Sequence, residues 1–340
     1  MTDYDLTATA QALVAPGKGI LAADESVATI SKRFAALGIT STAESRRAYR
    51  DMLLTAPDLA SFISGAILYD ETIRQGLPDG TPFPDVLHKR GILPGIKVDT
   101  GAKALAGAPG ETITEGLDGL RERIAEYVGF GARFAKWRAV IRIGDGLPSR
   151  TCIATNAHAL ARYAALCQEG GLVPIVEPEV LMDGAHTIER CFEVTDQTLR
   201  AVFAELADQG VALEEMVLKP NMVIAGKGAS RQTGVEEVAE ATLRCLLRTV
   251  PAAVPGIAFL SGGQSPELAT EHLNAMSGMG PMPWALTFSY GRALQDPSLA
   301  AWKGEPANVE AAQSALLHRA RCNGAARSST YSAAMEAEAA

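Results

Sequence analysis

The chain has 340 residues, 47% of them hydrophobic, which suffices to bury the core of one large barrel domain or of two smaller domains. Its 39 acidic and 31 basic residues leave a formal net charge of -8, which argues against a broad nucleic-acid-binding face and requires any phosphate to be held by local groups. The N-terminus resembles neither a secretory signal nor a transit peptide, and no apolar run is long enough to span a membrane, so we expect no membrane partner.

Eight short apolar segments, each followed by a helix pattern, are predicted to form strands. In chain order they span residues 19–24, 63–69, 95–99, 134–138, 172–177, 216–219, 256–261 and 284–289. Their spacing of roughly 30 to 45 residues leaves room for a crossover helix each time, as parallel strands require. The pattern predicts an α/β fold, a (β/α)8 or TIM barrel, as a single domain over residues 1–340. The Ala/Glu-biased segment 332–340 is predicted to be a mobile tail.

Three apolar stripes with helical spacing predict core-facing helices between these strands. The first stripe follows Asn156, which we expect to cap its helix, and Gly170 is expected to stop it. The stripes consist of Leu160, Tyr163 and Cys167; of Leu199, Val202, Phe203 and Leu206; and of Leu117, Leu120, Ile124 and Tyr127.

Charged side chains recur at the C-terminal ends of the predicted strands, which converge on one pocket in a barrel. Lys219 ends the sixth strand, while Lys136 and Arg138 share one face of the fourth. A lysine buried near a second cation is disfavoured as the ammonium, so a neutral nucleophilic amine becomes accessible for Schiff-base chemistry. Glu177 and Glu179, at the end of the fifth strand, offer a carboxylate pair for proton transfer. The alternative is an ion-pair layer that neutralises the barrel mouth.

The loop after the seventh predicted strand, residues 260–267, has the composition of a phosphate-binding turn. Gly262 and Gly263 let backbone N–H groups approach an anion, and Ser265 followed by Pro266 predicts a helix start. A Gly-Gly pair by itself is most often just a turn.

The loop after the eighth predicted strand, residues 288–292, strengthens the phosphate interpretation. It adds a second glycine turn and Arg292, whose guanidinium can make charge-assisted hydrogen bonds. Loops seven and eight are where barrels commonly bind phosphate. Ser26, Arg33 and Lys97 could hold a second anion across the mouth, with helix capping and solvated surface charge as the alternative.

Seven segments, taken in order, closely resemble the motifs of class I fructose-bisphosphate aldolase. They are residues 17–26, 95–99, 134–138, 176–179, 218–222, 259–265 and 289–292, and the resemblance runs from about Gly17 to Tyr331. It implies a lyase without metal or cofactor that reversibly cleaves fructose 1,6-bisphosphate to dihydroxyacetone phosphate and glyceraldehyde 3-phosphate, in glycolysis, gluconeogenesis or a carbon-fixing cycle. It further implies a cytoplasmic homotetramer whose partners are phosphorylated sugars.

The resemblance also implies a role for each matched residue. Lys219 matches the Schiff-base lysine and Glu177 the acid/base that dehydrates the carbinolamine, while Lys136, Glu179 and Asp24 match charged groups that order the site and assist carbon–carbon cleavage. One phosphate site is matched by Ser261, Gly262, Gly263, Ser289, Gly291 and Arg292. The far phosphate or the open-chain sugar is matched by Ser26, Arg33 and Lys97, and Thr29 and Arg138 are further substrate-binding candidates.

Two departures from the family pattern stand out. Val27, Ala28 and Thr29 replace the usual Thr-Gly-Ser after Ser26, so contacts to the far phosphate are expected to change, although Thr29 keeps a hydroxyl. Members of the vertebrate type end in a tyrosine that assists proton exchange on the enamine, whereas this chain ends in Ala340 and Tyr331 lies some way upstream. We predict that cleavage survives while enamine protonation is slower or uses another group.

Three other classes of function stay open from the residues themselves. A metal-dependent aldolase would need clustered ligands, whereas the five histidines are scattered and share no ligand-like spacing. Another Schiff-base lyase, acting on a different sugar phosphate, fits the same lysine. A non-catalytic binding protein fits the same fold. The five cysteines form no Cys-x-x-Cys pair and predict reduced, buried thiols of a cytosolic protein.

Overall fold

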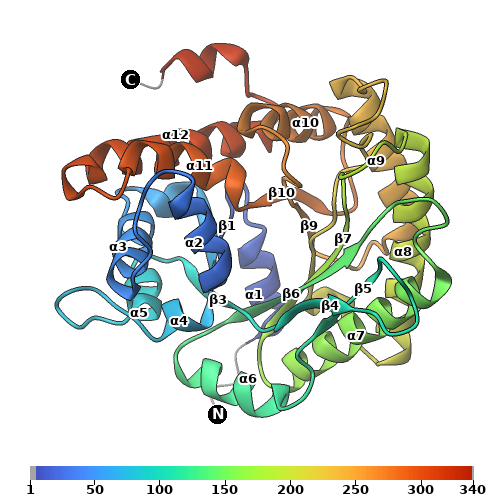
Figure 1. The fold of residues 1–340 in the computed structure, drawn as a ribbon, viewed down its shortest axis with the longest axis horizontal. Coiled ribbons are helices and arrows are strands. Elements are labelled where there is room, and N and C mark those ends of the chain that lie inside the picture. Colours follow the sequence, from blue (N-terminus) through green and yellow to red (C-terminus); the bar gives the residue numbers. More distant parts are fainter. Residues whose placement is uncertain (1–4, 339–340) are drawn as a thin grey trace.

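The computed structural model describes residues 5–338 as a closed barrel of eight parallel strands surrounded by helices (Figure 1). Around the barrel the strands follow the order β1-β10-β9-β8-β7-β6-β3-β2. Their bounds are β1 Gly19–Ala23, β2 Ile63–Leu68, β3 Leu93–Lys97, β6 Phe134–Ile141, β7 Val173–Val180, β8 Val217–Leu218, β9 Gly256–Phe259 and β10 Ala285–Tyr290. Each of the eight predicted strands overlaps one of these, so the predicted (β/α)8 barrel is confirmed.

The helices connect successive strands and form the outer layer. Their bounds are α1 Leu6–Leu13, α2 Val27–Ala35, α3 Ala43–Leu54, α4 Asp70–Ile73, α5 Phe83–Lys89, α6 Leu120–Gly129, α7 Arg150–Glu169, α8 Ile188–Asp208, α9 Val235–Thr249, α10 Pro266–Gly278, α11 Arg292–Trp302 and α12 Val309–Ala326. Short 3-10 helices span Leu59–Ser61, Leu213–Glu215, Pro306–Asn308 and Ala333–Glu338. None of the helices within residues 5–338 combines the length and hydrophobicity needed to cross a membrane.

One predicted helix cap was wrong, and one residue of a predicted helical stripe lies outside its helix. Ser149, not Asn156, caps α7, because its hydroxyl accepts a hydrogen bond from the Cys152 N–H at 3.1 Å. Asn156 lies buried inside the helix, where its amide donates to the carbonyl of Thr112 at 2.8 Å, so a tertiary contact uses the group that we expected at the cap. Leu117 precedes α6, which begins only after Gly119 with its positive φ of 65°.

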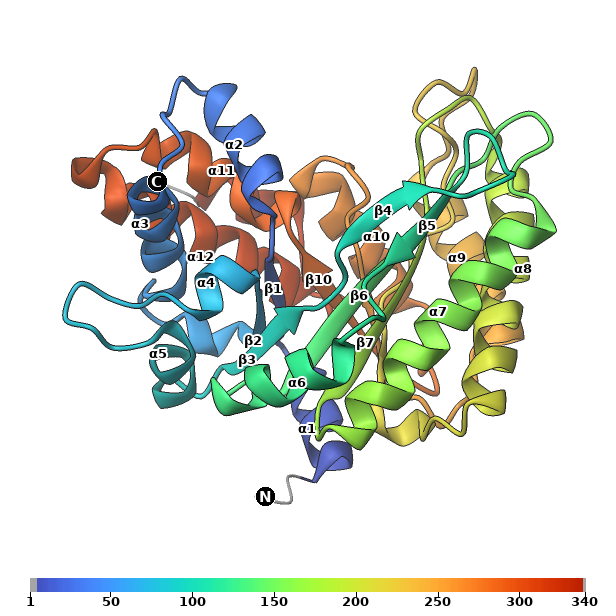
Figure 2. The same cartoon turned by 60° about the horizontal axis from the view of Figure 1, so that its bottom comes forward.

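A β-hairpin that the sequence did not predict lies beside the barrel mouth. β4 (Gly101–Ala104) pairs antiparallel with β5 (Thr112–Glu115), next to β6 and α7 (Figure 2). The hairpin leaves β3 just after Lys97, at the end where the strand side chains converge. It therefore adds backbone to the rim of the site.

The opposite end of the barrel is closed by α1, which lies beneath the strands (Figure 2). Leu13 and Val14 pack there in one buried cluster with Phe134, whose ring occupies the barrel interior. A β-carbon atom added at Gly95, on the neighbouring strand β3, would overlap this ring, and one added at Gly65 on β2 would lie 2.8 Å from Leu13 Cδ2 and 3.0 Å from the ring, so the two glycines make room for one large side chain. Because this end is filled, access to the barrel is from the C-terminal ends of the strands.

The segment 332–340, predicted to be a mobile tail, is described as far as residue 338; residues 339 and 340 lie outside the described part of the chain. Ala333–Glu338 form a 3-10 helix that lies near α12 (Figure 1). Glu336 accepts a hydrogen bond from Tyr331 Oη at 2.7 Å and forms ion pairs with Arg319 and with His318. These contacts hold this part of the tail against α12.

Candidate active site

A cavity of about 710 Å³ opens where the C-terminal ends of the barrel strands meet. The predicted site residues that line it are Asp24, Ser26, Thr29, Arg33, Lys97, Lys136, Arg138, Glu177, Glu179, Lys219, Ser261, Gly262, Ser289, Gly291 and Arg292. Gly263 does not line the cavity but follows Gly262 directly, beside Arg292. Residues from seven strand ends and their loops are thus brought to one pocket, as a parallel barrel requires.

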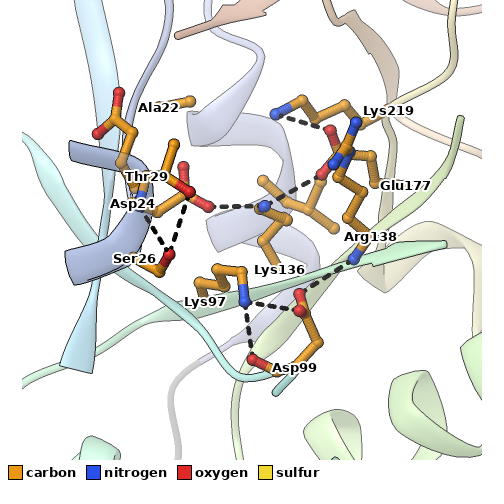
Figure 3. A network of polar contacts seen from close by, with 12 residues as sticks. Ala22, Asp24, Ser26, Thr29, Lys97, Asp99, Lys136, Arg138, Glu177 and Lys219 are labelled. Carbon is orange, nitrogen blue, oxygen red and sulfur yellow. Dashed lines mark hydrogen bonds and ion pairs between the residues drawn. The ribbon is translucent and has the colours of Figure 1, made fainter. Parts of the chain in front are cut away.

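A continuous chain of buried charges crosses the floor of this cavity (Figure 3). Lys219 Nζ lies 3.2 Å from Glu177 Oε1, and Lys136 Nζ lies 3.3 Å from Glu177 Oε2. Lys136 Nζ also lies 2.6 Å from Asp24 Oδ2. All four side chains are at most about a tenth exposed, so these ion pairs are poorly screened by solvent.

Strand geometry explains why these four residues meet. Lys219 directly follows β8 and continues its ladder, because its N–H donates to the carbonyl of Val176 at 2.8 Å. On β6, Lys136 stands two residues beyond Phe134 and shares its inward face. Asp24 follows β1, so each charge stands at a strand end.

The charges set the protonation of the carboxylates. Burial alone would raise the pKa of Asp24, but the ammonium groups of Lys136, Lys219 and Lys97 outweigh it and hold that pKa at about 2. The pKa of Glu177 is likewise lowered, because Lys136 and Lys219 overcome its burial. The carboxylates in turn raise the pKa of Lys136. Glu177 therefore enters a reaction as a proton acceptor.

Glu179 has a different partner from Glu177, although both belong to β7. Its carboxylate accepts a hydrogen bond from Arg138 Nε, and the pair lies farther along the cavity wall. The backbone N–H of Arg138 donates to Asp99 Oδ2 at 3.3 Å. The two glutamates thus have different ion-pair partners, although the Arg138 guanidinium also helps to lower the pKa of Glu177.

Asp99 is a cavity residue that the sequence analysis did not single out. Its carboxylate lies 2.6 Å from Lys97 Nζ, and Lys97 also donates to the Asp99 carbonyl at 2.8 Å (Figure 3). The sequence could have indicated Asp99, because it stands two residues after Lys97 at a strand end and therefore shares its face. These two contacts with Asp99 therefore fix the Lys97 ammonium at the rim of the cavity.

The loop after β9 has the geometry of an anion site. Gly262 and Gly263 adopt positive φ values of 59° and 86°, and the Gln264 N–H closes the turn on the Ser261 carbonyl at 3.0 Å. Ser265 caps α10 by accepting from Leu268 N–H at 3.1 Å, as predicted. The helix N-terminus adds a partial positive charge behind the loop.

The neighbouring strand β10 supplies two further groups to the same region. Ser289 is 1% exposed, and its hydroxyl makes no hydrogen bond within residues 5–338. Arg292 begins α11 and forms no ion pair with the described residues, so its charge stays uncompensated on the cavity wall. A buried donor and a spare guanidinium fit a phosphate group.

The start of α2 forms the cavity wall beside the loop after β10, because β1 pairs with β10 and Arg33 of α2 reaches Asp296 of α11. Ser26 caps this helix, accepting from the Thr29 N–H at 3.3 Å, and the two hydroxyl oxygens are 3.1 Å apart. Ser26 therefore caps the helix, as the alternative interpretation predicted. The hydroxyl groups of Ser26 and Thr29 nevertheless line the cavity. Arg33 pairs with Glu25 and, at 2.7 Å, with Asp296, two acidic partners that the sequence analysis missed.

Histidine and cysteine are absent from the cavity lining formed by the described residues. All five cysteines are buried, as predicted. Outside the cavity the ligand atoms of His318, Cys322 and Glu336 lie within 4.8 Å of one another, a grouping that the prediction of scattered histidines overlooked. The guanidinium of Arg319 already pairs with the same Glu336 carboxylate.

Comparisons with known proteins agree with this geometry. The family model described as "Fructose-bisphosphate aldolase class-I" matches residues 5–340. A "Probable fructose-bisphosphate aldolase class 1" of Xanthomonas campestris pv. campestris is 61% identical, covering 96% of this chain and 98% of the relative. "Fructose-bisphosphate aldolase 4, cytosolic" of Arabidopsis thaliana is 53% identical, covering 96% and 84%.

A solved structure of the fructose-bisphosphate aldolase from Plasmodium falciparum, in a ternary complex, superposes with a TM-score of 0.95. It is 50% identical to this chain and covers 96% of this chain and 95% of its own. The chain belongs to the class I fructose-bisphosphate aldolase family.

Proposed function

We propose that this chain is a metal-independent aldolase that reversibly cleaves fructose 1,6-bisphosphate to dihydroxyacetone phosphate and glyceraldehyde 3-phosphate through a Schiff base on Lys219. Family membership supports the reaction. The observation that carries the residue roles is the contact of Lys219 with Glu177 at 3.2 Å, in a buried chain that continues to Lys136 and Asp24. A nucleophilic amine beside a proton-transfer group is what iminium formation needs.

In the first half of the reaction, the Lys219 amine attacks the ketone carbon of the open-chain sugar. Its Nζ then carries the carbinolamine, whose hydroxyl must leave as water. The Lys219 ammonium first gives a proton to the Glu177 carboxylate, which frees the attacking amine; the nitrogen then passes a second proton to the carbonyl oxygen, and Glu177 returns the first proton to the hydroxyl as it leaves. The product is a protonated iminium between Lys219 and the substrate.

In the second half, the iminium accepts the electron pair of the carbon–carbon bond two atoms away. The C4 hydroxyl loses its proton to a carboxylate of the Asp24–Lys136–Glu177 chain, and glyceraldehyde 3-phosphate leaves as its carbonyl forms. The enamine that stays on Lys219 is protonated at carbon and hydrolysed to dihydroxyacetone phosphate. Lys136, whose ammonium is held between two carboxylates, keeps this chain of groups ordered.

Two sets of groups around the cavity are assigned to the two phosphates. The loops after β9 and β10, with Ser261, Gly262, Gly263, Ser289, Gly291 and Arg292, would hold one phosphate. Ser26, Thr29, Arg33, Lys97 and Arg138 would hold the other phosphate or the open-chain sugar. Because Arg33 and Lys97 already pair with carboxylates, the second site carries less uncompensated positive charge.

The deciding experiment traps the covalent intermediate. Borohydride reduction with dihydroxyacetone phosphate in excess EDTA, followed by peptide mass mapping, should place a stable adduct on Lys219 and none in Lys219→Arg. No adduct, with activity abolished by EDTA, would reject the Schiff-base mechanism in favour of a metal site. Comparing fructose 1,6-bisphosphate with fructose 1-phosphate then separates this function from that of another Schiff-base lyase.

We further infer that the chain acts as a homotetramer of single-domain subunits in the cytoplasm, without nucleic-acid or membrane partners. The family resemblance supports the tetramer, and the cytosolic isozyme of Arabidopsis thaliana supports the compartment. Light scattering would test the assembly: a tetramer has about four times the subunit mass of 35.7 kDa.

A further inference from the structure

Lys227 lies on the loop between β8 and α9, and its ammonium reaches the phosphate loop after β9. A Cβ atom added at Gly263 would lie 2.8 Å from Lys227 Nζ and 3.0 Å from Arg292 Nη2. Lys227 and Arg292, which come from different loops, therefore converge on one point beside Gly263. A side chain at position 263 would fill the space that these two cations border.

The backbone fixes the loop that carries Lys227. Three consecutive N–H groups donate to the loop after β7: Gly226 to His186 at 2.9 Å, Lys227 to Met182 at 2.8 Å and Gly228 to Gly184 at 2.8 Å. A Cβ atom at Gly226 would overlap the carbonyl of Gly184, so the two loops are in direct contact. The position of the Lys227 side chain thus depends on two braced loops.

The charges around Lys227 and Arg292 do not balance. Lys227 Nζ lies 3.8 Å from Asp183 Oδ1, and the two side chains are 47% and 66% exposed. An ion pair that long and that exposed contributes little. Arg292 has no ion pair within residues 5–338. The Lys227 ammonium and the Arg292 guanidinium therefore repel each other, and few nearby carboxylates offset this repulsion. An anion between them would remove this repulsion.

Other groups around this point select the kind of anion. The N-terminus of α10 begins just beyond Gly263, and the Ser289 hydroxyl, which lines the same cavity as Arg292, has no partner among the described residues. Several donors and two cations suit a dianion with at least three acceptor oxygens, which describes a phosphate monoester.

We propose that Lys227 is a further phosphate-binding residue, which together with Arg292 holds the phosphate at the Gly262–Gly263 loop. Lys227 supplies a point charge from the outer side of the loop, and Arg292 supplies a planar donor pair from the cavity side. The nature of the phosphate carrier, dihydroxyacetone phosphate or its ketose precursor, rests on the proposed function. The phosphate contact itself does not.

The first test measures binding of inorganic phosphate by calorimetry. Lys227→Met should raise Kd about 5- to 20-fold, since a charged hydrogen bond is lost from a half-exposed residue, while Lys227→Arg should keep most of the affinity. Lys89→Met is the matched control, because this exposed lysine ends α5 near the opposite end of the barrel. If calorimetry resolves two phosphate sites, Lys227→Met should weaken phosphate binding at only one of them. Equal Kd values in Lys227→Met and the unaltered chain would overturn the proposal.

The second test separates phosphate binding from damage to the site. Borohydride trapping on Lys219 is titrated with dihydroxyacetone phosphate and with unphosphorylated dihydroxyacetone. In Lys227→Met the half-saturating concentration should rise for the phosphorylated probe alone. An equal rise for both probes would contradict a phosphate contact. If the unaltered chain gives no adduct with either probe, the proposed function fails, and the phosphate titration still decides the role of Lys227.

Discussion

Glu177 is the residue at which the charges of the candidate site meet. It contacts Lys219 and Lys136 through its two carboxylate oxygens, and these ammonium groups lower its pKa despite its burial. A carboxylate that is ionised in the free protein can accept a proton from a neighbouring ammonium, which frees the amine to attack a carbonyl. Glu179, paired with Arg138, is not placed to do this for Lys219.

Replacing Glu177 by Gln removes the proposed acid/base and keeps the side-chain size. We expect kcat for fructose 1,6-bisphosphate cleavage to fall about 10²- to 10⁴-fold, the usual contribution of a positioned proton-transfer group. Stopped-flow measurement of iminium formation should show the loss in that step. Glu205→Gln, which alters a carboxylate paired with His158 on the helical layer, serves as the control. A loss below tenfold would remove Glu177 from its proposed role.

Tyr331 is held away from the chemistry by its own hydrogen bond. Its Oη donates to Glu336 Oε1 at 2.7 Å, and Tyr331 does not line the cavity. Burial and the neighbouring Glu336 carboxylate raise the pKa of Tyr331, which makes the phenol a weaker acid. In this position it is a poor donor to an enamine.

Tyr331→Phe should therefore have little effect on proton exchange at the carbon of dihydroxyacetone phosphate. We expect a change of less than about threefold, whereas losing a working general acid costs about 10²-fold or more. Isotope exchange followed by NMR measures this directly, with the cleavage rate as the reference. A large selective loss of exchange would show that Tyr331 reaches the enamine in another conformation.

At the level of elements, strands β3 and β6 fit together because a small residue faces a large one. A methyl group at Gly95 would overlap the ring of Phe134, which fills the barrel interior over α1. The Phe134 ring is buried against neighbouring strands, so it has little room to move aside.

Gly95→Ala is expected to lower the free energy of unfolding by about 1–3 kcal/mol through overpacking. Phe134→Leu alone should also destabilise, because it leaves a cavity. The double variant should be less destabilised than the sum of the two, since the smaller side chain makes room for the methyl group. Urea unfolding of the four proteins tests this, and strictly additive effects would show that the two side chains do not compete for space.

At the level of the whole molecule, stability depends on pH through a buried histidine on α10. His272 is 1% exposed, and its Nδ1 lies 2.6 Å from Gln264 Oε1. Burial lowers the pKa of His272 from 6.5 to about 4. The unfolded chain therefore binds this proton more readily than the folded chain between these two values. The folded state is favoured above pH 6.5, and this contribution is lost as the pH falls toward 4.

His272→Gln should remove that part of the pH dependence. Between pH 7 and pH 5 the unaltered chain should lose about 2 kcal/mol of unfolding free energy from His272 alone, a loss that the variant should not show. Urea unfolding at both pH values gives the slope for each protein, and His88→Gln, at an exposed histidine, is the control. Identical slopes in the unaltered chain and His272→Gln would mean that the pKa of His272 is the same in the folded and unfolded chain.

Much of the fold and of the candidate site follows from local pattern. The repeated strand and helix signals predicted all eight barrel strands. Because alternate residues share a strand face, Lys136 and Glu177 could be assigned inward from their spacing, and both line the cavity. The helix start at Ser265 was likewise readable, since Ser followed by Pro is a local capping signal.

The amino-acid sequence by itself determined the barrel, its strand ends and most of the residues that line its mouth, because hydrophobic period and strand alternation are properties of neighbouring residues. Only the tertiary structure decided that Glu177 pairs with Lys219 and Arg33 with Asp296, and that the Lys227 ammonium lies beside Gly263. These contacts join segments that are far apart in the chain, and their distances depend on loop backbones and on packing between strands. No local pattern carries that information.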